Sequence, residues 1–179
     1  EFDIENYDSA ITGSAEEGFI ITNTNTETVD INVEKIWVGP EGIEVTVLLR
    51  ANGVITGNTL TLNAENGWQG TFVGLPKYEY EGGGEIVYTI EELDIENYAS
   101  AITGSAEEGF TVTNTNTETV DIYVGKVWYG QPGTEVEVGL LADGRDTGRT
   151  VALNAANGWY GVFAGLPKHF DVTRYHSLA

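Results

Sequence analysis

The sequence repeats itself at a constant spacing, and this internal repeat is the strongest constraint on its fold. The segment SAITGSAEEGF occurs at 9–19 and again at 100–110, and TNTNTETVDI occurs at 22–31 and again at 113–122. Each match is displaced by 91 residues, and no gap opens until after Lys168. The 179 residues therefore contain just under two copies of a module of about 90 residues.

The termini of the chain do not coincide with the ends of the module. We predict that residues 29–119 form a complete module, that residues 1–28 are the C-terminal part of a module, and that residues 120–179 are the N-terminal part of the next. When residue 1 is placed after residue 179, with a three-residue deletion, the repeat continues: His176 aligns with Tyr88, Leu178 with Ile90 and Glu1 with Glu92. We therefore expect one period of a tandem array, or a subunit whose N-terminal segment completes its neighbour. The alternative is an arbitrary boundary with a frayed end.

The pattern within the module predicts an all-β fold. Short stretches of alternating apolar and polar residues are separated by turn-prone sequences such as GPEG, ANG and EGGG, and no segment has a helical period. The expected strands lie at 29–38, 44–49, 59–63, 70–75, 85–92 and 109–115. Strands of this length and spacing are typical of a β-sandwich, and two copies predict tandem sandwiches.

Three of these strands end an apolar stripe with a polar residue on the same face. Lys35 follows Val33, Glu92 follows Ile90, and Asn114 follows the apolar stripe of the last strand. The repeat supplies a second set: Lys126, Glu1 and Asn23. One inward Lys usually reaches water and one inward Asn usually caps a turn, but three in one module indicate a buried cluster.

Two interpretations fit such a cluster. The first is a buried Lys–Glu ion pair with Asn as a hydrogen-bond partner. The second is covalent: burial lowers a Lys pKa and raises a Glu pKa, so the pair can exist as neutral amine and neutral acid. A neutral amine held against a carboxamide carbon can attack it, with the acid assisting the oxyanion and the departing ammonia. The product is a Lys–Asn isopeptide bond.

The motifs of the module resemble those of a known family. EKIWVG and GKVWYG, the NGW and GLPKY segments, YTIEE and the closing TVTNT occur in the order found in Cna B-type (CnaB) domains of Gram-positive surface adhesins and pilins. The resemblance covers the whole repeat. It implies tandem inverse immunoglobulin-like sandwiches whose first and last strands are joined by a Lys–Asn isopeptide bond assisted by an acid.

The resemblance assigns a role to each residue of the two sets. It places the bond-forming Lys at Lys35 and Lys126, the Asn at Asn114 and Asn23, and the catalytic acid at Glu92 and Glu1. The second set departs from the family pattern, because HSLA replaces the expected strand and its acid and Asn lie across the chain ends. Bond formation is therefore expected foremost between Lys35 and Asn114.

Composition argues against several other classes of protein. The formal charge of −20 disfavours nucleic acid and anionic membranes as partners, and no apolar run is long enough to span a bilayer. There is no Cys, no zinc pattern around His169 or His176, and no EF-hand spacing around DGRD at 143–146, so we expect no cofactor or metal. Trp37 is interpreted as a core residue and Trp68 as a residue that packs over a sheet edge, rather than as a sugar-binding platform.

These observations predict a mechanical role. We expect a stalk or fibre repeat of a bacterial surface protein, extracellular and wall-anchored through other regions, whose partners are neighbouring repeats joined head to tail and whose host ligand binds at a distant tip. Bond formation would be a single self-directed turnover, so no enzyme activity is expected. The alternative is a ligand-binding adhesin module, and a glycosidase would need two facing carboxylates in a cleft.

Overall fold

The structure, a computed structural model, describes residues 1–169 and divides the chain into two compact units, Glu1–Thr115 and Asn116–Ala179. The described part is built from strands, with two short 3-10 turns, η1 and η2, in equivalent loops of the two copies. In chain order the elements are β1 (Tyr7–Ser14), β2 (Gly18–Asn25), β3 (Thr28–Val38), β4 (Glu44–Ala51), β5 (Val54–Asn63), η1 (Ala64–Asn66), β6 (Gln69–Pro76), β7 (Tyr88–Glu92), β8 (Tyr98–Ser105), β9 (Gly109–Asn116), β10 (Thr119–Gly125), β11 (Glu135–Ala142), β12 (Arg145–Asn154), η2 (Ala155–Asn157) and β13 (Tyr160–Pro167).

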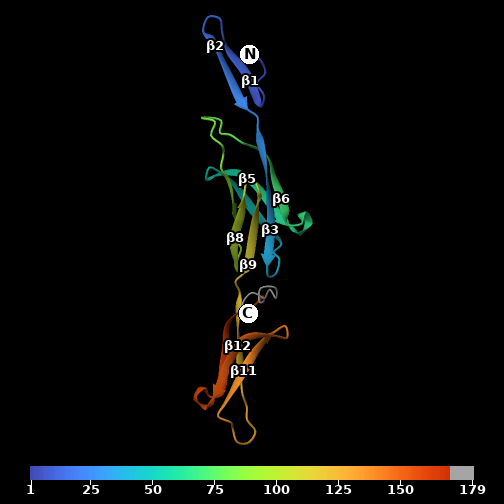
Figure 1. Ribbon diagram of the computed structural model, residues 1–179, viewed down its shortest axis with the longest axis vertical. Coiled ribbons are helices and arrows are strands. Elements are labelled where there is room, and N and C mark those ends of the chain that lie inside the picture. The colour runs from blue at the N-terminus through green and yellow to red at the C-terminus, as the bar shows by residue number, and fades with distance from the viewer. Residues whose placement is uncertain (170–179) are drawn as a thin grey trace. The chain divides into compact units, whose positions relative to one another are not determined.

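The first unit contains a β-sandwich and a separate hairpin. One sheet has the strand order β6-β3-β9-β8, the other has the order β5-β4-β7, and β1 pairs only with β2 (Figure 1). The alternating residues of both sheets meet in one core, in which Ile31, Val47, Leu49, Leu62 and Val112 have no exposed surface. The all-β sandwich predicted from the alternation is confirmed.

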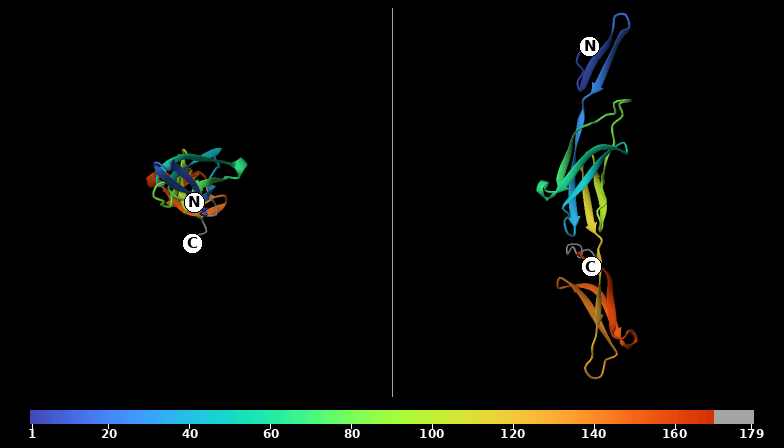
Figure 2. Two further views of the ribbon diagram at one scale, coloured as in Figure 1. Left: turned by 90° about the horizontal axis from the view of Figure 1, so that it is seen from above. Right: turned by 180° about the vertical axis from the view of Figure 1, so that it is seen from behind.

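The first and last strands of the sandwich are neighbours and run in parallel. β3 pairs with β6 through its first part and with β9 from Val33 to Val38, opposite Phe110 to Thr115. Figure 2 shows the blue β3 and the yellow β9 side by side from behind. Because parallel neighbours cannot be joined by a tight turn, the rest of the sandwich forms the connection between them.

A bulge in β6 sets the register against β3. Ile31 faces Phe72 and Val29 faces Leu75, so β6 carries one extra residue. Gly74 adopts a positive φ of 66° in this bulge, and its N–H donates to the carboxylate of Asp30 at 2.7 Å. The register shift recurs between β10 and β13, where the N–H of Gly165 donates to Asp121 at 2.7 Å.

The second unit repeats the first strands of the module. β10 pairs with β13, and β11 pairs with β12, in the registers of their counterparts β3–β6 and β4–β5. β10 ends at Gly125, whereas its counterpart β3 extends to Val38. The extra length of β3 coincides with its pairing to β9 from Val33 to Val38.

Several strands differ from the sequence prediction. β8 and its counterpart β1 are not predicted, because YASAITGS and YDSAITGS consist mainly of small and polar residues without a clear apolar alternation. The strand expected over 85–92 begins only at Tyr88, and Glu85 instead forms an isolated bridge with Tyr78. β1 and β8 form strands by pairing with β2 and β9, which carry more of the apolar residues.

We expect Leu49→Ala to lower the free energy of unfolding of the first sandwich strongly. Leu49 is fully buried in β4, and removing such a side chain leaves a cavity that destabilises a fold by about 2–5 kcal/mol. Faster hydrogen exchange in peptides from β3, β4 and β9 measures this loss of stability. Val54→Ala, at a residue with 70% exposure in β5, is the control and should leave exchange unchanged. Equal protection in both variants would contradict this packing.

Candidate functional site

Three polar side chains meet inside the first sandwich: Lys35 of β3, Glu92 of β7 and Asn114 of β9. The Nζ of Lys35 lies 3.2 Å from Oε1 of Glu92, and the Nδ2 of Asn114 donates to the same oxygen at 3.1 Å. The Lys35 side chain is 0% exposed and that of Glu92 is 2% exposed. Among residues 1–169 these three are the buried polar or charged residues. The structure thus brings together the first of the two sets singled out by the sequence.

The sheet registers explain why these side chains meet. In the parallel pairing of β3 with β9, Lys35 lies opposite Val112, and Asn114 lies opposite Trp37. All four residues share one face, so the Lys and the Asn are diagonal neighbours. Glu92, at the end of β7, pairs with Val47 in the other sheet and enters the core from the opposite layer. The site therefore requires both sheets in register.

Burial dominates the electrostatics of the lysine. Desolvation lowers the pKa of the Lys35 amine, and the nearby carboxylate of Glu92 opposes that change to a smaller degree. A buried charge is tolerated only when it is paired or neutralised.

A serine that the sequence analysis did not identify completes the site. The Oγ of Ser100 in β8 donates to Oε2 of Glu92 at 2.7 Å. Both oxygens of Glu92 are therefore held, one by Ser100 and the other by the amine and the carboxamide. The repeat contains a usable signal, since Ser100 recurs as Ser9 within the identical SAITGS segment.

The carboxamide of Asn114 is only half satisfied. Its Nδ2 binds Glu92, but its Oδ1 is buried without a hydrogen-bond partner. An unsatisfied buried acceptor costs about 1–3 kcal/mol, so native folds seldom retain one without a reason.

Aromatic rings close the site on the side of the lysine. The Nζ of Lys35 lies 4.4 Å from the ring centroid of Trp37, which makes edge contacts with Trp68 at 5.3 Å and Tyr98 at 5.0 Å. Trp68 is 9% exposed and its Nε1 donates to Glu41. Both Trp residues are part of the packed wall, which agrees with the structural rather than sugar-binding interpretation of them.

The second set of residues lies on two separate parts of the chain. In the β1–β2 hairpin, Asn23 Nδ2 donates to Glu1 Oε1 at 2.8 Å, and Ser9 Oγ donates to Glu1 Oε2 at 2.9 Å. Lys126 belongs to the second unit, is exposed, and lies 4.8 Å from the centroid of Trp128.

Each part of the second set repeats contacts of the first site. The hairpin reproduces the contacts of Glu92 with Asn114 and Ser100, and the second unit reproduces the contact of Lys35 with Trp37. His176 and Leu178, which the sequence places on the missing strand, lie outside the described residues.

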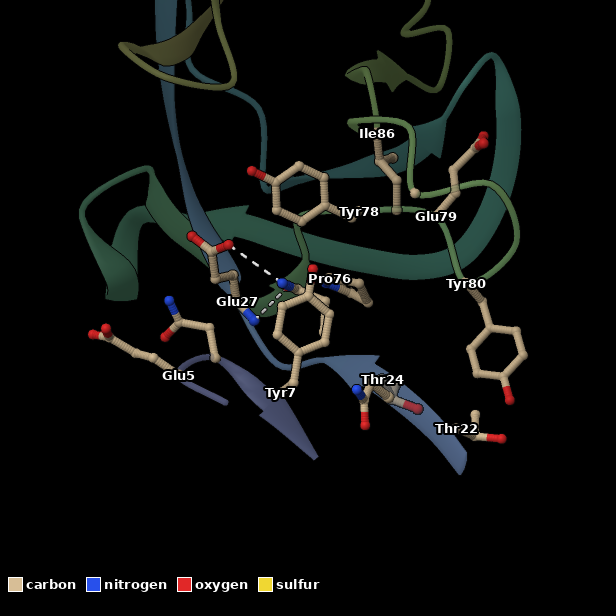
Figure 3. Close-up of a pocket in the computed structure, with 14 residues that line it drawn as sticks. Glu5, Tyr7, Thr22, Thr24, Glu27, Pro76, Tyr78, Glu79, Tyr80 and Ile86 are labelled. Carbon is tan, nitrogen blue, oxygen red and sulfur yellow. Dashed lines mark hydrogen bonds between the residues drawn. The ribbon is translucent and has the colours of Figure 1, made fainter. Parts of the chain in front are cut away.

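Among the described residues, a hollow lies beside β2. It has a volume of about 680 Å³, lies between β2 and the loop after β6 and is lined by side chains that include Tyr7, Glu27 and Tyr78 (Figure 3). Its carboxylates are exposed or half-buried. Within residues 1–169 no cluster of three or more His, Asp or Glu side chains is arranged to hold a metal, and no helix is long and apolar enough to cross a bilayer.

Comparison with known proteins connects this architecture to bacterial adhesins. The family model of the Cna protein B-type domain matches residues 31–115 and 122–176. The collagen adhesin of Staphylococcus aureus is 35% identical over 166 residues, which are 84% of this chain and 13% of the adhesin.

Two solved structures from S. aureus are similar to the chain. Two B repeat units of its collagen binding protein match at 30% identity with a TM-score of 0.50, covering 95% of this chain and 47% of that one. A single B repeat unit of the same surface protein is 33% identical, covering 81% of this chain and 80% of that one, with a TM-score of 0.45.

The sandwich and the comparisons together define a structural repeat of the kind carried by surface adhesins. The chain belongs to the Cna protein B-type domain family, and its fold is that of tandem CnaB modules, as the sequence motifs predict. It spans only 13% of the collagen adhesin and about half of the two-repeat structure.

We expect Asn23→Ala to raise the pKa of Glu1. Hydrogen bonds from Asn23, and then from Ser9, stabilise the carboxylate and hold the pKa of Glu1 below its ordinary value. Because the folded pKa is lowered, these bonds stabilise the hairpin above the unfolded pKa and are lost as the pH falls through the folded pKa. NMR titration of the Glu1 carboxyl measures the change. Thr22→Ala is the control, and an unchanged Glu1 pKa in Asn23→Ala would contradict the contact.

Proposed function

We propose that the chain is a load-bearing stalk repeat of a surface adhesin, locked by an intramolecular isopeptide bond between Lys35 and Asn114. The observation that carries the proposal is the buried cluster of an amine, a carboxyl and a carboxamide on β3, β7 and β9. A buried ion pair alone leaves the orphaned Oδ1 of Asn114 unexplained, whereas an acyl-transfer site needs a free carbonyl oxygen.

The shared oxygen of Glu92 supplies a path for protons. Oε1 contacts both the Nζ of Lys35 and the Nδ2 of Asn114, so it can take a proton from the first nitrogen and give it to the second. The neutral Nζ then attacks Cγ of Asn114, which it reaches without diffusion because both residues are fixed by strand pairing.

Every bond that forms in this reaction is matched by a bond that breaks within the cluster. The Nζ–Cγ bond forms, the Cγ–Nδ2 bond breaks, and Nδ2 leaves as ammonia after it gains one proton from Nζ, while Glu92 keeps the proton whose removal made the amine neutral. A half-turn of the carboxamide about Cβ–Cγ brings Oδ1 to the protonated Glu92, where it accepts a hydrogen bond as negative charge develops on it. Ser100 holds the other oxygen of Glu92 during these steps.

The position of the bond suits a force-bearing module. The chain enters the sandwich through β3 and leaves through β9, and the bond would join these two strands directly. Tension would pass from Lys35 to Asn114 and bypass the residues between them. Closing a loop of about 80 residues would also stabilise the fold by about 4–5 kcal/mol in the chain-entropy model.

The role of the whole protein follows from this proposal. We place the repeat outside the cell, anchored through other regions, in a tandem array whose neighbours are further repeats joined head to tail. A ligand such as the collagen named for the relatives would be bound by a different part of the protein. The hollow beside β2 does not favour the ligand-binding alternative, because it lies where the hairpin meets the sandwich and presents exposed carboxylates.

Intact-mass measurement tests the bond. We expect the purified chain to weigh less than its sequence by one ammonia, because each bond releases one. Lys35→Ala, Asn114→Ala and Glu92→Ala should restore the full mass, and Ser100→Ala should slow the loss during refolding, because Glu92 is then held by fewer contacts. Lys77→Ala, at a partly exposed lysine of the same module, is the matched control and should keep the loss. Full mass in the unmodified chain would contradict the proposal.

Single-molecule pulling tests the mechanical role. With handles before Thr28 and after Asn116, we expect the first module to release almost no length, because the bond bypasses the loop. Lys35→Ala should release about 80 residues, or roughly 270 Å of extended chain. Equal extension in both proteins would show that the load does not pass through these residues.

A further inference from the structure

Two buried polar atoms of the first sandwich have no hydrogen-bond partner, and they belong to neighbouring residues. Within residues 1–169 the buried side-chain nitrogen and oxygen atoms without a partner are the Nε1 of Trp37, the Oδ1 of Asn114 and the Nε1 of Trp128, the repeat equivalent of Trp37. An indole N–H can only donate, and a carbonyl oxygen can only accept. The donor of Trp37 and the acceptor of Asn114 are therefore complementary.

The strand register places these two residues side by side. Trp37 of β3 lies directly opposite Asn114 of β9 in the parallel pairing. Neighbouring strands are about 4.8 Å apart, and residues at paired positions point to the same face of the sheet. That face is the one on which Lys35 and Val112 are buried. The indole and the carboxamide thus enter the same part of the core as neighbours.

The packing around Trp37 fixes the direction of its ring. Edge contacts join it to Trp68 at 5.3 Å and to Tyr98 of β8 at 5.0 Å. Because β9 lies between β3 and β8 in the sheet, the rings of Trp37 and Tyr98 meet across the strand that carries Asn114. Gly42 leaves room for the far edge of the indole, since a Cβ there would lie 2.7 Å from Cη2 and 3.0 Å from Cζ2 of Trp37.

Packing alone does not account for an indole at this position. The Nζ of Lys35 lies 4.4 Å from the ring centroid of Trp37, a contact with the aromatic face that a Phe ring also provides. The neighbouring Trp68 shows the usual arrangement, because its Nε1 donates to a carboxylate oxygen of Glu41 at 3.3 Å. The N–H of Trp37 is instead kept inside the core, where it is available for a new acceptor.

The indole of Trp37 also lies beside the atoms that react. The Nζ of Lys35, which contacts the ring, is 3.2 Å from Oε1 of Glu92, and the half-turn of the carboxamide brings Oδ1 to this carboxyl. The ring therefore borders the position at which negative charge develops. Acyl-transfer sites stabilise such a charge with preorganised donors that need no rearrangement when the reaction occurs.

We propose that Trp37 is a catalytic donor of the isopeptide reaction and that its indole N–H donates to Oδ1 of Asn114 as the Nζ–Cγ bond forms. The inference rests on the proposed function, in which the protonated Glu92 gives the same oxygen its first hydrogen bond. Trp37 keeps its proton throughout, so the bonds formed and broken are unchanged. The hydrogen bond remains on the amide oxygen of the product, so both unpartnered atoms become satisfied when the bond forms.

Replacement of the N–H alone tests the role of Trp37 in the rate. A 179-residue chain made by chemical synthesis and kept in denaturant reacts only once it is allowed to fold, and intact mass then follows the loss of ammonia. Benzothienylalanine at residue 37 keeps the shape of the ring and exchanges the N–H for sulfur. We expect the reaction to be about 100-fold slower, as when one oxyanion donor is removed. The same replacement at Trp68, whose N–H contacts Glu41, is the matched control and should leave the rate unchanged.

NMR of the indole protons tests the same contact without any change to Trp37. We expect the indole proton of Trp37 to move downfield and to exchange more slowly with solvent when the bond forms, because it gains an acceptor. In Lys35→Ala, which cannot form the bond, the proton should keep its original position. The indole proton of Trp68 should be the same in both proteins, because its partner Glu41 takes no part in the reaction.

The outcomes separate this inference from the proposed function. Equal rates of ammonia loss for the replacements at residues 37 and 68 would overturn the role of Trp37 and leave the proposed bond intact. A slower reaction with an unchanged indole signal of Trp37 would show that the ring acts by packing, which also overturns it. Loss of no ammonia from the unmodified chain would overturn both. The NMR comparison decides the question even if the replacement at residue 37 disturbs folding.

Discussion

The contact of Lys35, Glu92 and Asn114 in a dry interior is the interaction on which the rest of the structure depends. The side chains of Lys35 and Glu92 are both buried, so each charge needs the other as its partner. The pair forms only when both sheets keep their register. Desolvation lowers the pKa of the Lys35 amine and so favours its reactive form. Under the proposed function, the desolvation that makes this cluster costly as an ion pair also favours its conversion into an amide.

The parallel pairing of β3 with β9 affects both the buried site and the path of the chain through the module. It places the amine and the carboxamide on one face, and it also makes these strands the entry and exit of the module. A bond between them would carry load without engaging the apolar core. The same pairing distinguishes β3 from its counterpart, because β3 extends to Val38 along β9, whereas β10 ends at Gly125.

Much of this could be predicted from the sequence because strand alternation is a strong signal where one face is buried. It indicated the inward direction of Lys35, Glu92 and Asn114, and the motifs indicated the family. β8 and Ser100 were missed because small residues carry no apolar period and because the serine contacts Glu92 across strands. The sequence pattern does not indicate that β10 ends at Gly125, because the length of a strand also depends on the strand it pairs with. The roles of Lys126, Asn23 and Glu1 remain predictions, because these residues lie on separate parts of one chain.

Peptide mapping tests the central claim most directly. Trypsin cleaves after Arg50, Lys77 and Lys126 but not after an acylated lysine. The account predicts a branched species in which residues 1–50 are joined to residues 78–126 with the loss of one ammonia, and fragmentation should place the junction at Lys35 and Asn114. Recovery of residues 1–35, 36–50 and 78–126 as separate peptides, with an intact Asn114, would contradict it.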